Sequence, residues 1–587
     1  MAVAALAGML ALPVTAEAGR AITGPCRTVF CAGISQDGSR VVFPFEEELT
    51  AGAGERQIYE RSAGKTRALL PYERSSEKTG ALLPPRGKDW PRLDEVSVDA
   101  THVFVTTNRP LAPEDTDGLG TDLFDISGGR ATLISTGPLD AQSNGGAIAS
   151  FMGISPDGGR VFFDAFTPMT ADDADGCPDL YQRAAGQTTL VAADPDPPPP
   201  PICSTTVFGG VSADGFHLFF SSAADLEPGD ERGEDIYQQV GGVLTRLTTY
   251  PEPEGSCVDL VKFADASNDG STVLFATNSP VTPEDTDSAF DVYKRRPDGT
   301  FVLVSRGTDG GSGQCGFGGD RALALAADGG VAIFETGARL SPADRDSSND
   351  LYSADDSGAF ELISTGPADA SIDERSSVFP DWPALASDDA RRVAFETHQS
   401  LVAADKDTAA DVYVRAGGAT ELISAGLPGR KAPGNAELLA LSGDGSAVVF
   451  ATAEPLVARD LDRARDIYLR GSGQERSALI SRETIAPNMQ IAKHGALLRS
   501  GRIAVRLSCP KSETSGPCRG RLVLTAGRRG ARVGAASFRI APGRRVRVPI
   551  RPRARFRAAV PKSAFARARG IDALGNARVV ARKIRIG

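Results

Sequence analysis

The sequence has few of the residues that most often carry out chemistry. Histidine occurs only four times in 587 residues, at the scattered positions His102, His217, His398 and His494. The metalloprotease motif H-E-x-x-H, the phosphate-binding P-loop and the nucleophile motif G-x-S-x-G are all absent. The C-x-x-C spacing typical of zinc or thioredoxin-like sites is absent as well. These absences exclude the commonest metalloprotease, nucleotide-binding and α/β-hydrolase active sites.

Long apolar runs are also lacking, and none is long enough to cross a bilayer. The run AVAALAGMLALPV near the start is short and is followed by Ala16-Glu17-Ala18, which is similar to a signal-peptidase site. We therefore predict that residues 1–18 are a signal peptide. No basic residue precedes the run, so a buried strand or helix is the alternative. A signal peptide implies a secreted or cell-envelope location.

The eight cysteines fit export, because an even number in an exported chain indicates disulfides. Free buried thiols are the alternative, and the sequence does not fix the pairing. The cysteines fall in four near pairs: Cys26 and Cys31, Cys177 and Cys203, Cys257 and Cys315, Cys509 and Cys518.

The stretch from Ile154 to Ala192 holds four short apolar runs separated by turns. Its first turn, Pro156-Asp157-Gly158-Gly159, combines a fixed φ, a side chain that bonds its own backbone and a residue that accepts positive φ. Strands are expected at Arg160–Phe163, 179–181 and 188–191. Four antiparallel strands in about 40 residues are typical of one propeller blade.

The same frame recurs eight times with a period near 58 residues. In each copy the turn aspartate precedes a large apolar residue by six positions: Asp37/Phe43, Asp99/Val105, Asp157/Phe163, Asp214/Phe220, Asp269/Phe275, Asp328/Phe334, Asp389/Phe395 and Asp444/Phe450. A third-strand motif such as DLY or DVY follows in seven copies, and the first copy has Gln57-Ile58-Tyr59 instead. The pattern predicts an all-β protein whose residues 19–481 form an eight-bladed β-propeller. Because the first copy diverges, seven blades are the alternative.

These landmarks resemble the WD-like propeller repeats of the TolB family, whose blades carry S-P-D-G, an apolar strand and then D-I-Y. The resemblance covers roughly residues 28 to 481. It implies a β-propeller that serves as an interaction platform. The same family supplies the propellers of some serine peptidases, so the resemblance indicates fold better than function.

Charge divides the chain in two. Residues 482–587 contain 26 basic and 3 acidic side chains, whereas residues 1–481 contain 38 basic and 72 acidic ones. Alternating strands with arginine on the polar face predict a small Ig-like β-sandwich over 493–587, after a linker at 482–492. Cys509 and Cys518 are expected to clamp its first hairpin. A basic surface of this kind suits a polyanion, although aromatic residues for base stacking are few and no specific nucleic-acid recognition is expected.

The loop between the second and third strands is the candidate site. Its frame is D-x-D-x3-D, with one extra residue in the earliest copy. Carboxylates at alternate positions are similar to the start of calcium-binding loops, so calcium is the cofactor that the pattern favours. The alternative is that these aspartates only cap turns and fix the entry to the third strand. The candidate ligands are Asp115, Asp117, Asp122, Asp173, Asp175, Asp179, Asp285, Asp287, Asp291, Asp344, Asp346, Asp350, Asp405, Asp407, Asp411, Asp460, Asp462 and Asp466.

Three functions follow from these patterns. The first is a non-catalytic, monomeric scaffold that binds an envelope protein or polymer. The second is a propeller-type hydrolase or lyase acting on a glycan or peptide, which would need a deep central pocket lined by one unrepeated carboxylate pair or by a Ser/His couple. The third is a surface anchor that grips a polyanion through the arginine-rich domain.

Overall fold

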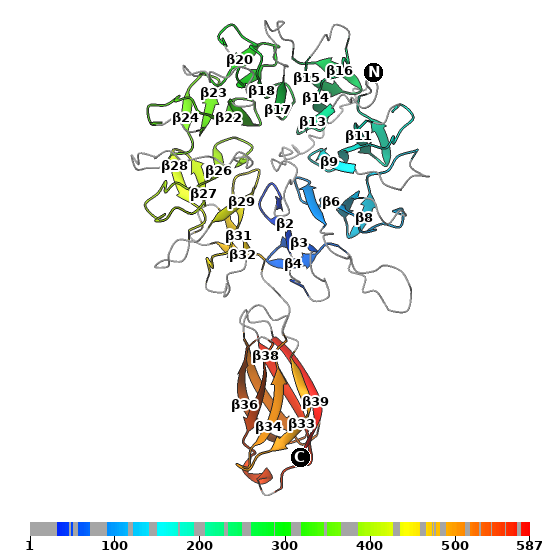
Figure 1. Cartoon of the computed structure of the whole chain (residues 1–587), viewed down its shortest axis with the longest axis vertical. Coiled ribbons are helices and arrows are strands. Elements are labelled where there is room, and N and C mark those ends of the chain that lie inside the picture. The colour runs from blue at the N-terminus through cyan, green and yellow to red at the C-terminus, as the bar shows by residue number, and fades with distance from the viewer. Residues whose placement is uncertain are drawn as a thin grey trace, which may run out of the picture.

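Eight four-stranded antiparallel sheets follow one another along the chain in the computed structural model and surround a common centre (Figure 1). The eight-bladed propeller is thereby confirmed, and the seven-bladed alternative is excluded. The structure describes residues 32–45, 49–50, 57–70, 91–115, 121–139, 149–173, 177–192, 206–227, 233–248, 260–286, 288–306, 319–345, 349–365, 385–425, 435–457, 465–471, 474, 477–481, 489–510, 517–527, 530–541, 543–557, 559–571 and 577–587. The predicted signal peptide lies outside these residues. In the described part of the chain, no helix is long and apolar enough to span a membrane.

Each blade takes four consecutive strands. Blades one to four are β1 (Gly33–Ile34), β2 (Arg40–Phe45), β3 (Gln57–Ser62) and β4 (Lys65–Ala68); β5 (Arg92–Val96), β6 (His102–Thr107), β7 (Asp122–Ser127) and β8 (Arg130–Leu133); β9 (Ala149–Ile154), β10 (Arg160–Ala165), β11 (Asp179–Ala184) and β12 (Gln187–Leu190); β13 (Thr206–Val211), β14 (His217–Ser222), β15 (Asp235–Val240) and β16 (Val243–Arg246). Blades five to eight are β17 (Val261–Ala266), β18 (Val273–Thr277), β19 (Asp291–Arg295) and β20 (Phe301–Leu303); β21 (Arg321–Leu325), β22 (Val331–Thr336), β23 (Asp350–Asp355) and β24 (Phe360–Leu362); β25 (Leu385–Ala386), β26 (Arg392–Thr397), β27 (Asp411–Ala416) and β28 (Ala419–Leu422); β29 (Ala436–Leu441), β30 (Ala447–Thr452), β31 (Asp466–Gly471) and β32 (Ala478–Leu479).

The first turn of a blade is held by a serine and an aspartate. In blade three the Ser155 hydroxyl donates to Asp157 Oδ1 at 2.6 Å and accepts the Arg160 N–H at 2.9 Å. The hydrogen bond from Ser155 is the main reason why the pKa of Asp157 is lowered. Gly158 adopts a φ of +72°, which a side chain would make costly. The same serine–aspartate bond recurs in seven blades, while blade six has Ala326 in place of the serine.

The arginine-rich end of the chain forms one seven-stranded sheet in the order β36-β35-β38-β39-β33-β34-β37. Its elements are β33 (Gln490–Leu497), β34 (Ile503–Ser508), β35 (Cys518–Thr525), β36 (Arg532–Ile540), β37 (Arg545–Ile550), the 3-10 turn η2 (Ala554–Phe556), β38 (Ser563–Ile571) and β39 (Ala577–Ile586). A bridge between Gly534 and Pro552 brings the two edges together, so the sheet curls into a nearly closed barrel around an apolar core. The sheet begins at Gln490, inside the segment predicted as a linker.

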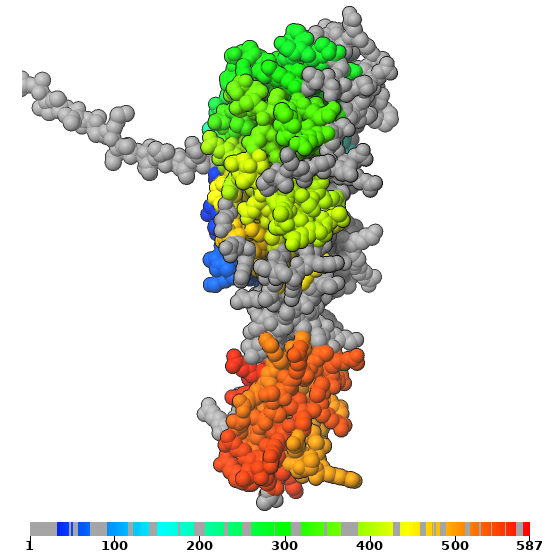
Figure 2. Space-filling view, turned by 90° about the vertical axis from the view of Figure 1, so that its left-hand side faces the viewer, coloured from blue at the N-terminus to red at the C-terminus, as the bar shows by residue number. Residues whose placement is uncertain are grey.

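This second body lies beyond the rim of the propeller in both views (Figures 1 and 2).

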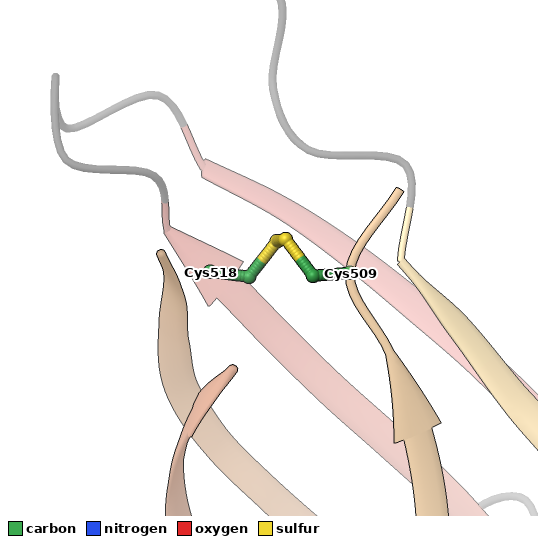
Figure 3. Close-up of a disulfide and its surroundings, with 2 residues drawn as sticks. All are labelled: Cys509 and Cys518. Atoms are coloured by element: carbon green, nitrogen blue, oxygen red, sulfur yellow. A yellow bond between two sulfur atoms is a disulfide. The ribbon is translucent and has the colours of Figure 1, made fainter. Parts of the chain in front are cut away.

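A disulfide joins Cys509 and Cys518 with 5.8 Å between their Cα atoms (Figure 3). The predicted pairing is right, but the predicted hairpin clamp is wrong. β34 and β35 are not neighbours in the sheet, because the chain crosses over between them. Cys177 is also disulfide-bonded, and its partner lies outside the described residues, as do Cys26, Cys31, Cys203, Cys257 and Cys315.

The propeller closes without exchanging a strand between its first and last blades. One buried cluster joins Val41, Phe43 and Tyr59 of blade one to Val449 and Ile467 of blade eight. Backbone bonds between the inner turns run around the ring as well. They include Gln36 N–H to Val98 O, Ala327 N–H to Asp388 O, Asp388 N–H to Gly443 O and, across the closure, Asp444 N–H to Gln36 O at 3.1 Å.

In five blades the inner-turn glycine packs over the start of the second strand in the preceding blade, whereas blades two and seven have alanine at this turn position. A Cβ added at Gly158 would lie 2.9 Å from His102 Cβ, and one at Gly270 would lie 2.5 Å from the His217 ring. At Gly38 the added Cβ would lie 2.6 Å from Ala447 Cβ. The closing interface therefore uses the same close contact as the interfaces within the array.

We predict that Gly38→Ala lowers the melting temperature more than Gly64→Ala does. Both glycines have positive φ, +67° and +74°, so both substitutions strain the backbone by about 1 kcal/mol. Only the Gly38 site meets an atom of another blade, because nothing lies within 4 Å of a Cβ at Gly64. Thermal unfolding of the two variants measures the difference, and Ala447→Gly should restore stability to Gly38→Ala. Equal losses in the two single variants would contradict a closed ring.

Candidate functional site

The acidic loops lie on one face of the propeller. In a blade of four antiparallel strands, the loop after the second strand and the loop that leads to the next blade emerge at the same end. The inner turns and the last hairpin of each blade lie at the other end. We call the first end the loop face. The candidate calcium ligands therefore share one face of the ring with the long joining loops.

The first aspartate of the loop accepts a hydrogen bond from the buried third-strand tyrosine of its own blade. In blade six, the Tyr352 hydroxyl donates to Asp344 Oδ2 at 2.6 Å and accepts the Leu340 N–H at 3.3 Å. Burial, reinforced by this bond to the carboxylate, raises the pKa of Tyr352. The arrangement recurs in four blades, as Tyr181–Asp173, Tyr293–Asp285, Tyr352–Asp344 and Tyr413–Asp405. The tyrosine thus ties the loop to the core.

The last aspartate of the loop accepts a hydroxyl from the end of the fourth strand. In blade two, Ser135 donates to Asp122 Oδ1 at 2.8 Å and accepts the Leu123 N–H at 3.1 Å. The equivalent pairs are Thr248–Asp235, Ser305–Asp291, Ser364–Asp350, Ser424–Asp411 and Ser481–Asp466. This aspartate fixes the entry to the third strand, as the turn-capping alternative expects.

The middle aspartates are described in one blade only. Asp117, Asp175, Asp287, Asp346 and Asp462 lie outside the described residues, as does Asp460. Asp115 and Asp179 are described, at positions equivalent to the first and last carboxylates of the other loops. Calcium binding by five of the six loops therefore remains a prediction. The loop of blade seven is described throughout.

In blade seven, Asp405, Asp407 and Asp411 come together. One carboxylate oxygen from each lies within 4.8 Å of the other two. Asp411 is completely buried, and burial, together with the charges of Asp405 and Asp407, raises the pKa of Asp411 to about 7. Among the described residues, this is the one group of carboxylates close enough to hold a metal ion together.

The histidines divide into structural and loop-positioning residues. His102 Nδ1 lies 2.9 Å from Asp125 Oδ2, and His217 Nδ1 lies 2.9 Å from Gln238 Nε2, and both rings pack beneath inner-turn glycines. These contacts give both histidines a structural role. His398 was not singled out by its sequence context, yet its Nδ1 donates to Thr408 O at 3.1 Å and so braces the acidic loop of blade seven.

The innermost strand of blade two carries a carboxylate pair that the other copies lack. Asp94 is 1% exposed and accepts hydrogen bonds from Arg92 at 2.6 Å and from Thr106 at 2.5 Å. Burial raises the pKa of Asp94 to about 6 and that of the neighbouring Glu95 well above its usual value. An unrepeated pair of this kind is one of the two arrangements that the hydrolase hypothesis expects. Both side chains are buried, Asp94 at 1% and Glu95 at 7% exposure.

No protein-family model matches the sequence, and no curated protein matches it. Among solved structures, one of two prolyl endopeptidases studied for interdomain dynamics matches at 16% identity and a TM-score of 0.39, over 70% of this chain and 53% of the other. The GH74 enzyme of Niastella koreensis matches at 11% identity and a TM-score of 0.30, over 95% and 85% of the two chains. The tricorn protease matches at 11% identity and a TM-score of 0.22, over 94% and 59%. The chain spans about half the length of the prolyl endopeptidase.

A partly buried glutamate links the last two blades beneath the loop face. Glu396 of β26 accepts the backbone N–H of Leu438, which belongs to blade eight. Burial raises the pKa of Glu396 to about 7, although the Leu438 N–H and the nearby Arg465 oppose the shift. A carboxyl group with a raised pKa in the folded state favours folding below its unfolded pKa, near 4.5. That contribution is lost as the pH rises through about 7.

We predict that Glu396→Gln makes stability less dependent on pH. Glutamine keeps an oxygen for the Leu438 N–H but has no charge to desolvate. Between pH 5 and pH 8 the wild type should lose about 1–3 kcal/mol relative to the variant. Melting temperatures across this range measure the effect. Glu335→Gln, at the same strand position in blade six, controls for the loss of a buried carboxylate, and parallel curves for wild type and Glu396→Gln would refute the prediction.

Proposed function

We propose that this protein is an exported, non-catalytic binding scaffold of the cell envelope whose propeller holds a cationic partner on its loop face. The proposal is carried by the hydrogen bonding of the repeated polar side chains. In the described loops the tyrosines, serines and outer aspartates of the motif bind one another and the backbone. These side chains hold the blade together, so the remaining residues of the loop face are free to differ between blades and to bind a partner.

The charge of the propeller supports a cationic partner. Residues 1–481 carry nearly twice as many acidic as basic side chains. The acidic loops of successive blades are brought to one face by the ring, and a face of one sign attracts and orients ligands of the other. The resemblance to TolB-like repeats favours the same role as an interaction platform, and the predicted signal peptide and the disulfides favour export.

The proposal predicts that the immobilised full-length chain retains a basic protein or polymer from an envelope extract. Because the attraction is electrostatic, retention should fall as NaCl is raised from 50 to 500 mM. Parallel columns with EDTA show whether a bound cation contributes. The control is a variant with reduced loop-face charge: Glu114→Gln, Asp172→Asn and Glu284→Gln remove three acidic side chains that stand beside, and not within, the D-x-D-x3-D frame. Equal retention by the wild type and this variant, or none by either, would contradict the proposal.

The second candidate function is anchoring to an anionic polymer, and one feature of the C-terminal domain favours it. Arginines stand directly opposite each other on neighbouring strands, as Arg519 with Arg539 and Arg521 with Arg569. All four are exposed, and Arg567 lies on the same face of β38. We call these five residues the arginine face. Like charges directly opposite each other on a sheet are destabilising.

Among the described residues of its own domain, the arginine face has no acidic partner. The only acidic residues after position 481 are Glu483, Glu513 and Asp572, and all three lie outside the described residues. Among the described residues of this domain there is no ion pair to a carboxylate. Guanidinium groups on a rigid sheet offer bidentate donors to phosphate or carboxylate groups at regular intervals. An extended anionic envelope polymer is the partner that fits this face.

We predict that Arg521→Gln with Arg569→Gln weakens binding to a polyanion such as polyphosphate about tenfold or more at low salt. The matched control is Arg506→Gln with Arg547→Gln, which removes the same charge from another pair of facing arginines, on β34 and β37, outside the arginine face. Co-sedimentation at increasing salt gives the affinities and the number of contacts. Equal weakening by the two double variants would show a diffuse charge effect, and would reject a specific arginine face.

A further inference from the structure

The loop between β26 and β27 gathers three carboxylates, two of which are buried. Asp405 is 5% exposed and Asp411 is 0% exposed, while Asp407 is half-buried. One oxygen of each carboxylate lies within 4.8 Å of the others. Two buried carboxylates and a third beside them are costly unless their charge is compensated.

The hydrogen bonds of the loop leave that charge only partly compensated. Asp405 accepts the Tyr413 hydroxyl and the Asp407 N–H, and Asp407 accepts the Ala409 N–H at 2.9 Å. Asp411 accepts the Ser424 hydroxyl through Oδ1. Its other oxygen, Oδ2, is buried and has no hydrogen-bond partner in the described structure. A buried carboxylate oxygen without a donor is an independent sign that a ligand belongs there.

No basic side chain supplies the missing charge. Among the described residues, none of the three aspartates forms an ion pair with lysine, arginine or histidine. The loop is held from outside by other contacts, since Ser400 donates to Asp407 O at 2.9 Å and His398 donates to Thr408 O. The carboxylates are therefore brought together by the fold and not by mutual pairing with a cation of the chain.

We propose that Asp405, Asp407 and Asp411 bind one Ca²⁺ ion, which fastens the acidic loop to blade seven. Calcium takes six to eight oxygen ligands at about 2.3–2.6 Å, so a single ion can touch three oxygens with this spacing. Carboxylates without nitrogen or sulfur ligands suit a hard cation and not zinc or copper. Backbone carbonyls of the loop and water complete the coordination.

This site is distinct from the proposed binding role. An ion that fastens one loop adds stability whether or not the loop face holds a partner. Conversely, the loop face can attract a cationic partner without calcium. Failure of one proposal therefore leaves the other in place. Calcium binding is tested by the number of bound ions, whereas the binding scaffold is tested by retention of a partner.

The test is the number of calcium ions bound by the full-length chain after EDTA treatment, measured by equilibrium dialysis against CaCl₂ in 150 mM NaCl. Asp407→Asn removes one ligand charge and keeps an oxygen for the Ala409 N–H. We expect this variant to bind one ion fewer than the wild type. In EDTA its melting temperature should equal that of the wild type. Glu361→Gln, which removes an exposed charge that pairs with Arg415 and with none of the three aspartates, is the control and should bind the wild-type number.

Tyr413→Phe separates ion binding from folding. This variant loses the hydroxyl that holds Asp405 but keeps all three carboxylates, so it should melt lower and still bind the wild-type number of ions. The inference is overturned if the wild type binds no calcium, or if Asp407→Asn binds as many ions as the wild type. A loss of one ion in Asp407→Asn, with Glu361→Gln unchanged, supports it.

Discussion

The packing of each blade against its two neighbours is the constraint on which the whole structure depends. A four-stranded sheet has two apolar faces and too few residues to cover either of them. The eight buried clusters of the propeller each combine side chains from two adjacent blades, and the last of them joins blade eight to blade one. Burial of this kind is complete only when the array returns to its start. The ring is therefore a consequence of apolar area, and the inner-turn hydrogen bonds fix its geometry.

The repeated polar residues serve this packing before they serve any ligand. The third-strand tyrosine stacks on the second-strand phenylalanine, for example Phe163 with Tyr181 at 5.8 Å between ring centroids, and its hydroxyl leaves the core at the loop face. There it meets the first aspartate of the loop. The same aspartate therefore satisfies a buried hydroxyl and, in blade seven, contributes to a cluster of carboxylates. A motif that is repeated along the chain for stability can in this way create a site in only one of its copies.

Much of the propeller was predictable because its determinants are local. The S-x-D-G turn, the apolar second strand and the D-x-Y third strand lie within one repeat, and periodicity alone places them. The blade-seven cluster was also predictable, as a spacing of aspartates. The sequence did not reveal that the outer aspartates accept Tyr413 and Ser424, because those hydroxyls are distant in the repeat and meet the carboxylates only after the strands pair.

Features that depend on contacts between distant segments were not predictable. The approach of Gly38 to Ala447 joins the two ends of the repeat array, and no local pattern encodes it. The link from β34 to β35 was mistaken for a hairpin clamp because a separation of nine positions between two cysteines is typical of a hairpin. The pairing of Arg521 with Arg569 depends on a strand register that alternation of polar and apolar residues does not fix.

Hydrogen exchange at the inner turns tests the closed ring most directly. The amide of Asp444 donates to Gln36 across the closure, just as the amide of Ala327 donates to Asp388 within the array. A closed ring predicts that the two amides are protected to a similar degree in the native protein. Protection at Ala327 together with rapid exchange at Asp444 would contradict closure, and with it the account of the fold given above.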